Sequence, residues 1–244
     1  MTKDELRELL EDELLWRFEE INFFKKQLIN LEEENEQRKY RKSMVLILYS
    51  HLEGFIKSAL INYAQYLNGL GRKREEFDFT LIATSMNREF KAYENKNSKS
   101  SLFNNKKIPS DDSIHGLYRR VNLLESSSNL LSQPLIIEDT AVDTESNLWY
   151  VVLQKNLYRL GLPTDMFEEY RSDIDNLVNR RNTIAHGSRT DGVADTEYVR
   201  WESSTKSVME NIVRKIYFYA NNEKYLRTIV VQLSRQKSKL FIMN

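Results

Sequence analysis

The chain has 244 residues, of which 41% are hydrophobic and 30% are charged, a composition typical of globular proteins. It contains no cysteine, which excludes disulfides, thiolate zinc sites and cysteine nucleophiles and suits a reducing compartment. The first residues are acidic and lack an apolar signal core, and the longest apolar run, residues 44–49, is too short to span a bilayer. We therefore expect a soluble cytoplasmic protein that does not associate with a membrane.

The formal net charge is zero, but the charges are unevenly distributed. Residues 1–36 hold 5 Lys and Arg against 12 Asp and Glu, whereas residues 72–107 hold 9 against 5 and residues 198–244 hold 9 against 3. Two interpretations are open. The basic segments form a face for a polyanion, or they are ordinary solvated helix surface.

Only 7 Gly and 3 Pro occur, so long helices are expected. Apolar residues recur at helical spacing over residues 4–31 and again over residues 36–67, which predicts two adjacent helices in an antiparallel hairpin. Thr2 followed by Glu5 is the pattern of a capping box and marks the start of the first helix.

The middle of the chain is less regular and is rich in polar residues. We expect a Lys, Asn and Ser-rich loop that is more mobile than its surroundings, because it offers little apolar surface to bury. The predicted elements are a short helix within 77–93, this loop at 95–108, a helix over 110–124 and a short strand at 135–137, the rest of 126–145 being irregular.

Helical spacing returns after residue 146. Thr164 or Asp165 is the expected cap of the informative helix, and Gly187 is well placed as its C′ residue. The predicted helices cover residues 147–160, 165–185, 195–220 and 223–235. The sequence thus predicts an all-α helical bundle in one domain, 1–244, with an insertion or irregular segment at about 72–145.

Arg181 is a charged residue at an apolar position of the helix predicted over 165–185. At 100° per residue it falls within the same stripe as Ile174, Leu177 and Val178, which are apolar. A guanidinium that points at a packed face needs an anionic partner, because an unpaired buried charge is costly. Two interpretations remain open: a salt bridge to a neighbouring helix, or a phosphate site.

Asn182 and His186 are four residues apart and so project from neighbouring positions on that helix. An imidazole can accept and donate a proton near neutral pH, although a histidine before a helix-ending glycine can also serve as a simple cap. The other histidines, His51 and His115, are distant in sequence, and no metal-ligand spacing or nucleotide-binding glycine motif is present, so no metal or cofactor is expected.

The segment from Arg181 to Gly187 resembles the Arg-x4–6-His signature of the HEPN superfamily. The earlier run Leu48-Tyr49-Ser50-His51-Leu52-Glu53-Gly54-Phe55 is similar to the second-helix pattern of bacterial branches near the RiboL-PSP group. Both matches come in the order and spacing of that superfamily. The spacing of Arg181 and His186 carries little weight alone, because the chain has 18 arginines.

This resemblance implies a helical bundle in which Arg181 and His186 face their symmetry mates across a homodimer. It implies a metal-independent endoribonuclease that leaves a cyclic phosphate and a 5′-hydroxyl, acting as a toxin or anti-phage effector. Arg181 would hold the scissile phosphate, His186 would transfer protons and Asn182 would orient either group. Glu53 would pair with Arg181, or it is an ordinary solvated glutamate.

The resemblance leaves the activity open, because many HEPN domains are inactive. The alternative is a silent HEPN module that dimerises and binds RNA or a partner protein. A structural helical protein with a fortuitous Arg181 and His186 pair is the third interpretation. The expected partners are RNA, a second copy of the chain and a separate neutralising or regulatory protein chain.

Overall fold

The computed structural model describes residues 1–100, 112–187 and 190–227. These residues are mainly helical, and the described part of the chain contains no β-strand, which confirms the predicted all-α class. The chain divides into two compact units. The first unit comprises 1–66 and 139–224, and the second comprises 67–138 and 225–244.

Three long helices form the frame of the first unit: α1 (Lys3–Ile29), α2 (Glu34–Gly69) and α8 (Asp195–Asn221). Polar contacts establish that α1 runs antiparallel to both α2 and α8. Glu13 and Glu20 of α1 meet Ser58 and His51 of α2 in reverse order. Contacts between α1 and α8 show the same reversal, in the pairs Asp4–Tyr217, Asn22–Lys206 and Lys25–Glu202. The expected α1–α2 hairpin is therefore confirmed.

The N-terminal cap of α1 is the predicted capping box. The Thr2 hydroxyl accepts a hydrogen bond from the Glu5 amide at 3.1 Å, and the Glu5 carboxylate accepts one from the Thr2 amide at 2.6 Å. These reciprocal bonds satisfy donors that a helix start otherwise leaves free, and they lower the pKa of Glu5. The local sequence was sufficient to predict this feature.

Helix α2 is the central helix of the first unit, and its interior side chains are almost completely buried. They include Tyr49, Leu52, Phe55 and Ala59. By length and composition, one stretch of α2 is apolar enough to cross a membrane, and just over half of that stretch is buried within the protein.

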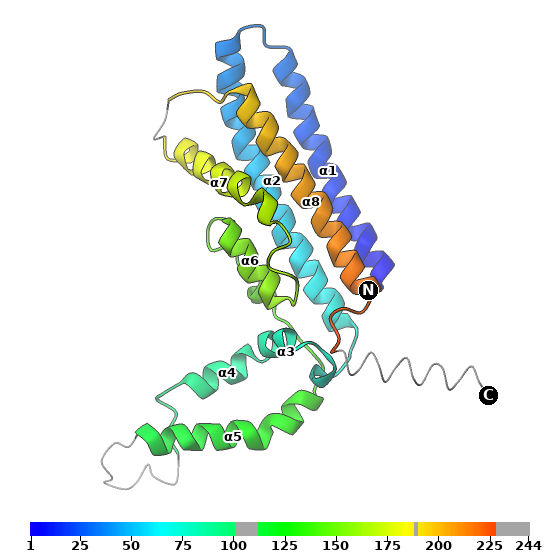
Figure 1. Ribbon diagram of the computed structural model, residues 1–244, viewed down its shortest axis with the longest axis vertical. Helices are drawn as coiled ribbons and strands as arrows, with labels where there is room; N and C mark the ends of the chain where they lie inside the picture. Colours follow the sequence, from blue (N-terminus) through cyan, green and yellow to red (C-terminus); the bar gives the residue numbers. More distant parts are fainter. Residues whose placement is uncertain (101–111, 188–189, 228–244) are drawn as a thin grey trace, which may run out of the picture. The chain divides into compact units, whose positions relative to one another are not determined.

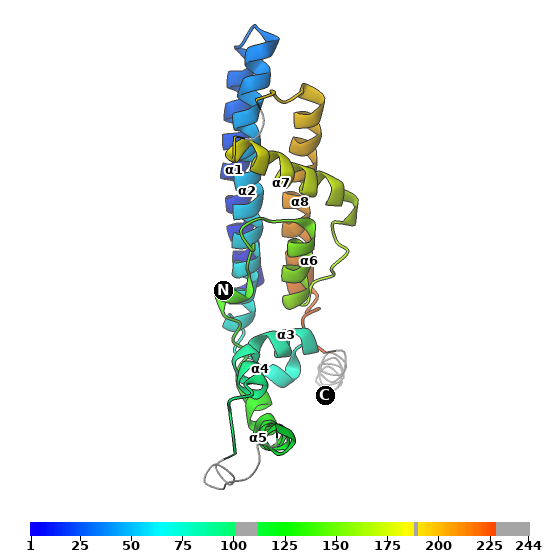
Figure 2. The ribbon, with the colours of Figure 1, turned by 90° about the vertical axis from the view of Figure 1, so that its left-hand side faces the viewer.

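Two shorter helices complete the first unit: α6 (Tyr150–Arg159) and α7 (Arg171–Ala185). Figures 1 and 2 show α7 running obliquely across α2 and α8. The Asp175 carboxylate of α7 accepts a hydrogen bond from the Tyr150 amide at 2.9 Å, which fixes the start of α6 against α7. The helix predicted to begin near residue 165 instead begins at Arg171, because Phe167 is fully buried in a turn that leads into the 3₁₀ turn Glu168–Tyr170.

The second unit contains the helices α3 (Phe79–Ser85), α4 (Asn87–Glu94) and α5 (Asp112–Ser132). The single helix predicted within 77–93 is two helices, because the backbone leaves helical geometry at Met86 (φ −102°, ψ 20°). Helix α5 continues eight residues past the predicted end at residue 124, so part of the segment expected to be irregular is helical. Most of the predicted loop, from residue 101, lies outside the described residues, as does most of the helix predicted over 223–235.

The strand predicted at 135–137 is wrong. Leu135 and Ile137 are buried while Ile136 is 53% exposed, an alternation that a strand with one buried face would also show. However, the Ile137 backbone is bonded to the side-chain amide of Asn68 through both its N–H and its C=O. The Leu135 N–H donates to the Arg72 carbonyl oxygen at 2.9 Å as part of an isolated antiparallel β-bridge between Lys73 and Pro134, which ends before residues 135–137.

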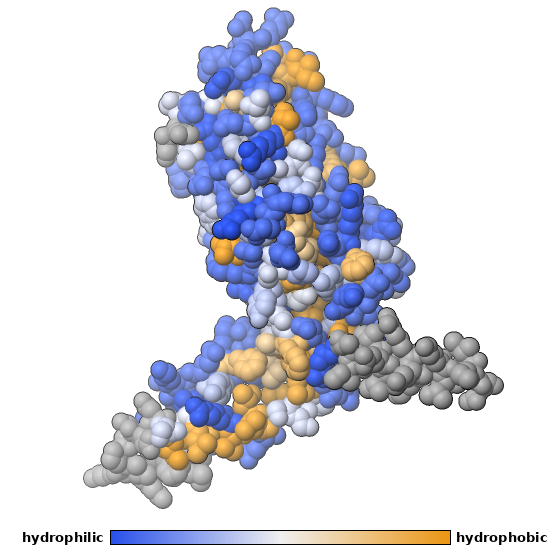
Figure 3. Space-filling view, in the orientation of Figure 1, coloured by the Kyte–Doolittle hydropathy of each residue, from blue (hydrophilic) through white to orange (hydrophobic). Residues whose placement is uncertain are grey.

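Helix α5 also carries exposed apolar side chains on one face. Leu117, Val121 and Leu124 follow one another at helical spacing and are 52%, 40% and 73% exposed. Figure 3 shows hydrophobic surface over this helix.

Candidate active site

The end of α7 brings the predicted motif together. Ile174, Leu177 and Val178 bury one side of the helix. At its C-terminus, the His186 amide donates to the Asn182 carbonyl oxygen at 3.0 Å, and Gly187 follows with φ +66°. A left-handed residue at this position ends a helix at low cost only when it lacks a side chain. Gly187 therefore sets where the helix stops and leaves His186 at its last turn.

Arg181 is half-buried and lies over the ring of Tyr49, with 4.8 Å between its guanidinium carbon and the ring centroid. Its Nη1 donates to the Asn182 side-chain oxygen at 2.9 Å and to the Asn147 side-chain oxygen at 3.2 Å. The sequence led us to expect a carboxylate or a phosphate here. Among the described residues, the charge is instead met by an aromatic face and two amide oxygens.

Tyr49 is the fully buried base of this arrangement. Its hydroxyl oxygen accepts a hydrogen bond from the Leu148 amide at 2.8 Å. Burial raises the pKa of Tyr49 to about 12, and a hydrogen bond with the nearby Glu53 carboxylate acts in the same direction. The phenol is consequently neutral at physiological pH and donates its proton to Glu53, which holds the ring beneath Arg181.

Glu53 therefore does not pair directly with Arg181, as the resemblance had suggested. Both side chains instead contact Tyr49, which lies one helical turn before Glu53 in α2. Glu53 bonds the Tyr49 hydroxyl, and Arg181 lies over the Tyr49 ring. The Asn182 side-chain oxygen likewise accepts a hydrogen bond from Arg181. Its contact with His186 is a backbone bond, from the His186 N–H to the Asn182 carbonyl oxygen. The structure thus assembles Arg181, Asn182, Glu53, Tyr49 and Asn147 into one group.

His186 stands apart from that group. Its side chain is exposed, and no hydrogen bond or ion pair to another described residue holds it. Five residues separate it from Arg181, which corresponds to about 140° around a helix. The two side chains therefore leave the same end of α7 in different directions.

The other imidazoles are engaged elsewhere. His51 is buried and lies 3.1 Å from the Glu20 carboxylate, and burial lowers its pKa. His115 accepts a hydrogen bond from the Ser100 amide at 3.2 Å. His186 is the exposed imidazole of the described chain. Within the described ranges, no three His, Cys, Asp or Glu side chains are grouped closely enough to hold a metal ion.

Sequence reasoning missed two members of the group, Tyr49 and Asn147. Tyr49 lies within the run 48–55 and four residues before Glu53, so the helical spacing of these two residues was an available signal. Asn147 precedes α6 and is 34 residues from Arg181 in the chain. No local pattern predicts a contact of that kind.

Comparison with known protein families is decisive at this point. The profile of the RiboL-PSP-HEPN family matches residues 12–217, which include all of α2, α6 and α7 and most of α1 and α8. The chain belongs to the RiboL-PSP-HEPN family. No curated protein and no solved structure gives a significant match. Family membership confirms the resemblance drawn from the two sequence runs, and the match spans both Tyr49 and the α7 motif.

Proposed function

We propose that this RiboL-PSP-HEPN protein is a metal-independent endoribonuclease whose active site is completed by a second copy of the chain. The observation that carries the proposal is the arrangement at the end of α7. Arg181 is fixed over Tyr49, and the exposed His186 lies at the same helix end. Family membership supports the proposal, because HEPN domains are often ribonucleases.

Arg181 is suited to hold a phosphate. Both of its hydrogen bonds to described residues come from Nη1, so Nη2 and Nε are left for two phosphate oxygens. The contact with the Tyr49 ring and the two bonds of Nη1 hold the guanidinium in place before substrate arrives. A preorganised cation of this kind stabilises the charge that develops on the phosphate in the transition state.

His186 is suited to proton transfer. In RNA cleavage by transesterification, a base removes the proton of the 2′-hydroxyl while an acid protonates the departing 5′-oxygen. The P–O5′ bond breaks as the 2′-oxygen bonds to phosphorus, which leaves a 2′,3′-cyclic phosphate and a 5′-hydroxyl. Imidazole can perform either proton transfer at neutral pH, and neither step requires a metal ion.

A two-fold dimer resolves the separation of the two side chains. Each chain offers one exposed imidazole, whereas the reaction uses one base and one acid. Two-fold symmetry supplies the second imidazole from the same sequence and can direct the partner's motif toward Arg181. We place the enzyme in the cytoplasm as a toxin or anti-phage effector, restrained by a separate neutralising protein chain.

The second candidate is a catalytically silent HEPN module that dimerises and binds RNA or a partner protein. The divergence of Arg181 and His186 on α7 favours it, as does the use of the Asn182 side chain to hold Arg181. Purified protein incubated with total RNA in EDTA separates the two candidates. The enzyme produces fragments that end in cyclic phosphate, whereas the silent module leaves the RNA intact.

A mixing experiment tests the composite site directly. Wild-type protein is mixed with a rising excess of His186→Ala protein, and the subunits are allowed to exchange. If each site needs imidazoles from both chains, activity falls much further than the activity of wild-type protein diluted into buffer. Activity that depends only on the amount of wild-type chain would contradict the composite site, as would a strictly monomeric active species.

A further inference from the structure

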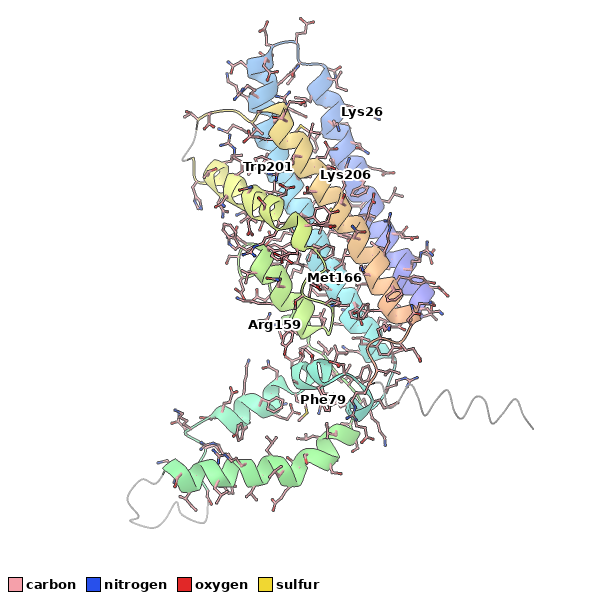
Figure 4. The ribbon with its side chains drawn as sticks, in the orientation of Figure 1. Lys26, Phe79, Arg159, Met166, Trp201 and Lys206 are labelled. Carbon is pink, nitrogen blue, oxygen red and sulfur yellow. The ribbon has the colours of Figure 1, made fainter. Side chains whose placement is uncertain are left out.

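A polar pocket of about 340 Å³ lies between α7 and α8, away from the group around Arg181. Its wall on α8 includes Trp201, which Figure 4 labels beside α7. At 100° per residue, Asn176 and Thr183 lie about 140° to 160° around α7 from Arg181. The pocket therefore occupies the opposite face of the helix. It is lined by Asn176, Asn179, Arg180, Thr183, Glu197, Arg200 and Trp201.

The lining carries more hydrogen-bond donors than acceptors. Asn176 and Asn179 are exposed and present side-chain amides, each with two donor hydrogens and one acceptor oxygen, although the Asn176 amide already donates one hydrogen bond to the Ser172 hydroxyl at 3.2 Å. The Arg200 side chain is 61% exposed and forms an ion pair with Asp173 through Nε at 2.6 Å, so its two terminal nitrogens take no part in that pair. Glu197 is occupied in part, because its carboxylate accepts a hydrogen bond from the Ala194 amide.

Arg180 adds a buried cation to the wall of the pocket. Its side chain is only 8% exposed, and its Nη2 is saturated by Asp191 and by the carbonyl oxygen of Gly192. Its Nε, in contrast, is buried without a hydrogen-bond partner. A buried donor without an acceptor is unfavourable, and an oxygen atom of a bound molecule in the pocket would satisfy it.

The pocket leads toward His186. Asn179, Thr183 and His186 follow one another at i, i+4 and i+7, so they share one strip of α7. At a rise of about 1.5 Å per residue, Thr183 precedes His186 by roughly 4.5 Å along the helix axis. A single RNA strand in contact with His186 would therefore place an adjacent nucleotide at the mouth of the pocket.

We infer that this pocket binds one unpaired nucleotide of the RNA substrate, and the inference rests on the function proposed above. The side-chain amides of Asn176 and Asn179 are suited to the edge of a base, which single-stranded RNA exposes. Nε of Arg180 and the terminal nitrogens of Arg200 are suited to phosphate or ribose oxygens. The pocket makes the nuclease selective at one position beside the cleaved bond.

Binding of RNA to a variant that cannot cleave it tests this assignment. His186→Ala protein is titrated into a fluorescently labelled short single-stranded RNA, with and without the added changes Asn176→Ala and Asn179→Ala. Both asparagines are exposed, so their loss leaves the fold intact. Loss of the amide contacts weakens binding about tenfold or more, since each good contact to a base edge corresponds to a factor of about ten.

Arg171→Ala is the matched control, because Arg171 is an exposed cation of α7 that does not line the pocket. It should change the affinity less than twofold. Equal affinities with and without the asparagine changes would overturn the inference. Equal weakening for single-stranded and duplex RNA would also overturn it, because a duplex cannot insert an unpaired base.

Cleavage mapping separates this inference from the proposed function. If the otherwise wild-type chain cleaves RNA, the double asparagine variant should lose its sequence preference beside the cut while retaining His186-dependent cleavage. Cleavage with unchanged preference and unchanged affinity would refute the pocket alone. Asparagine-dependent binding by a chain that never cleaves would refute the nuclease and leave the pocket in place.

Discussion

Two adjacent arginines on α7 occupy opposite environments. Arg180 is buried, and a single nitrogen, Nη2, bonds Asp191 and Gly192 in the loop that leads to α8. Arg181 is half-buried on the other side, where it meets the Tyr49 ring and two amide oxygens. One step of about 100° around the helix separates a structural cation from a candidate catalytic one.

The difference lies in what satisfies each charge. The carboxylate and carbonyl oxygens around Arg180 neutralise and saturate its terminal nitrogen, so Arg180 ties the loop to α7. An aromatic face and amide oxygens position Arg181 without cancelling its charge, which remains available to an anion. We therefore expect changes at Arg180 to act on stability first, beside any effect on the pocket, and changes at Arg181 to reduce activity.

The largest expected effect is loss of RNA cleavage in His186→Ala and Arg181→Ala. Removal of a proton-transfer group lowers the rate by about 10² to 10⁴, and loss of a phosphate-binding cation has a comparable effect. Arg181→Lys should also lose most activity, because lysine keeps the charge but not the planar fork. The measurement is the initial cleavage rate in EDTA, with thermal unfolding followed on the same samples.

Arg171→Ala again provides the control for this comparison and should retain both activity and stability. If well-folded His186→Ala protein cleaves RNA at the wild-type rate, the activity belongs to another site, and the silent-module interpretation is preferred. If Arg181→Ala merely unfolds the protein, Arg181→Lys and His186→Ala still test the mechanism.

Arg180→Ala should instead lower the free energy of unfolding by about 1 to 3 kcal/mol. The cause is the loss of charge-assisted hydrogen bonds to Asp191 and Gly192, which leaves partly buried carbonyl oxygens without that donor. Denaturant unfolding monitored by circular dichroism measures the change. A stability equal to that of wild type, together with loss of cleavage, would reverse the roles assigned to the two arginines.

Gly192→Ala tests the loop that Arg180 holds. A Cβ atom at this position would lie 2.5 Å from the Cβ atom of Arg38 and 2.9 Å from its backbone. These atoms cannot move aside cheaply, so we expect a loss of about 1 to 3 kcal/mol of stability from overpacking. Ala194→Gly, two residues later, is a control that adds no atom. Equal stability of Gly192→Ala and wild type would show that the loop can move away from α2.

The smallest expected effect concerns the ring beneath Arg181. Because the pKa of Tyr49 is raised to about 12 in the folded chain, its proton is retained while an unfolded tyrosine loses its own near pH 10. Tyr49 therefore contributes stability that is present below pH 10 and is lost as the pH rises through 12. Tyr49→Phe should remove one late-titrating phenol from the ultraviolet absorbance titration and weaken this alkaline dependence.

The same variant should reduce cleavage only a few-fold, because phenylalanine keeps the ring beneath Arg181 but not the bonds to Leu148 and Glu53. Tyr49→Leu removes the ring and should cost more activity. If both variants cleave like wild type, Tyr49 supports the fold and does not position Arg181.

Much of the first unit was predictable from the sequence. The periodic apolar residues of α1, α2 and α8 specify long helices, and Thr2, Glu5 and Gly187 mark ends through bonds within a few residues. The motif at 181–186 and the run at 48–55 pointed to the HEPN family, which the match over 12–217 confirms.

Local patterns succeeded where the deciding interactions are local, as in the capping box of α1. They failed at residues 135–137, where the Asn68 side chain replaced a partner strand, and at residue 165, where burial of Phe167 delayed the start of α7. Tertiary packing alone decided that Tyr49 and Asn147 hold Arg181 and that the adjacent Arg180 faces the loop. Such choices depend on which face of α7 meets α2, and helical spacing within α7 carries no information about that partner.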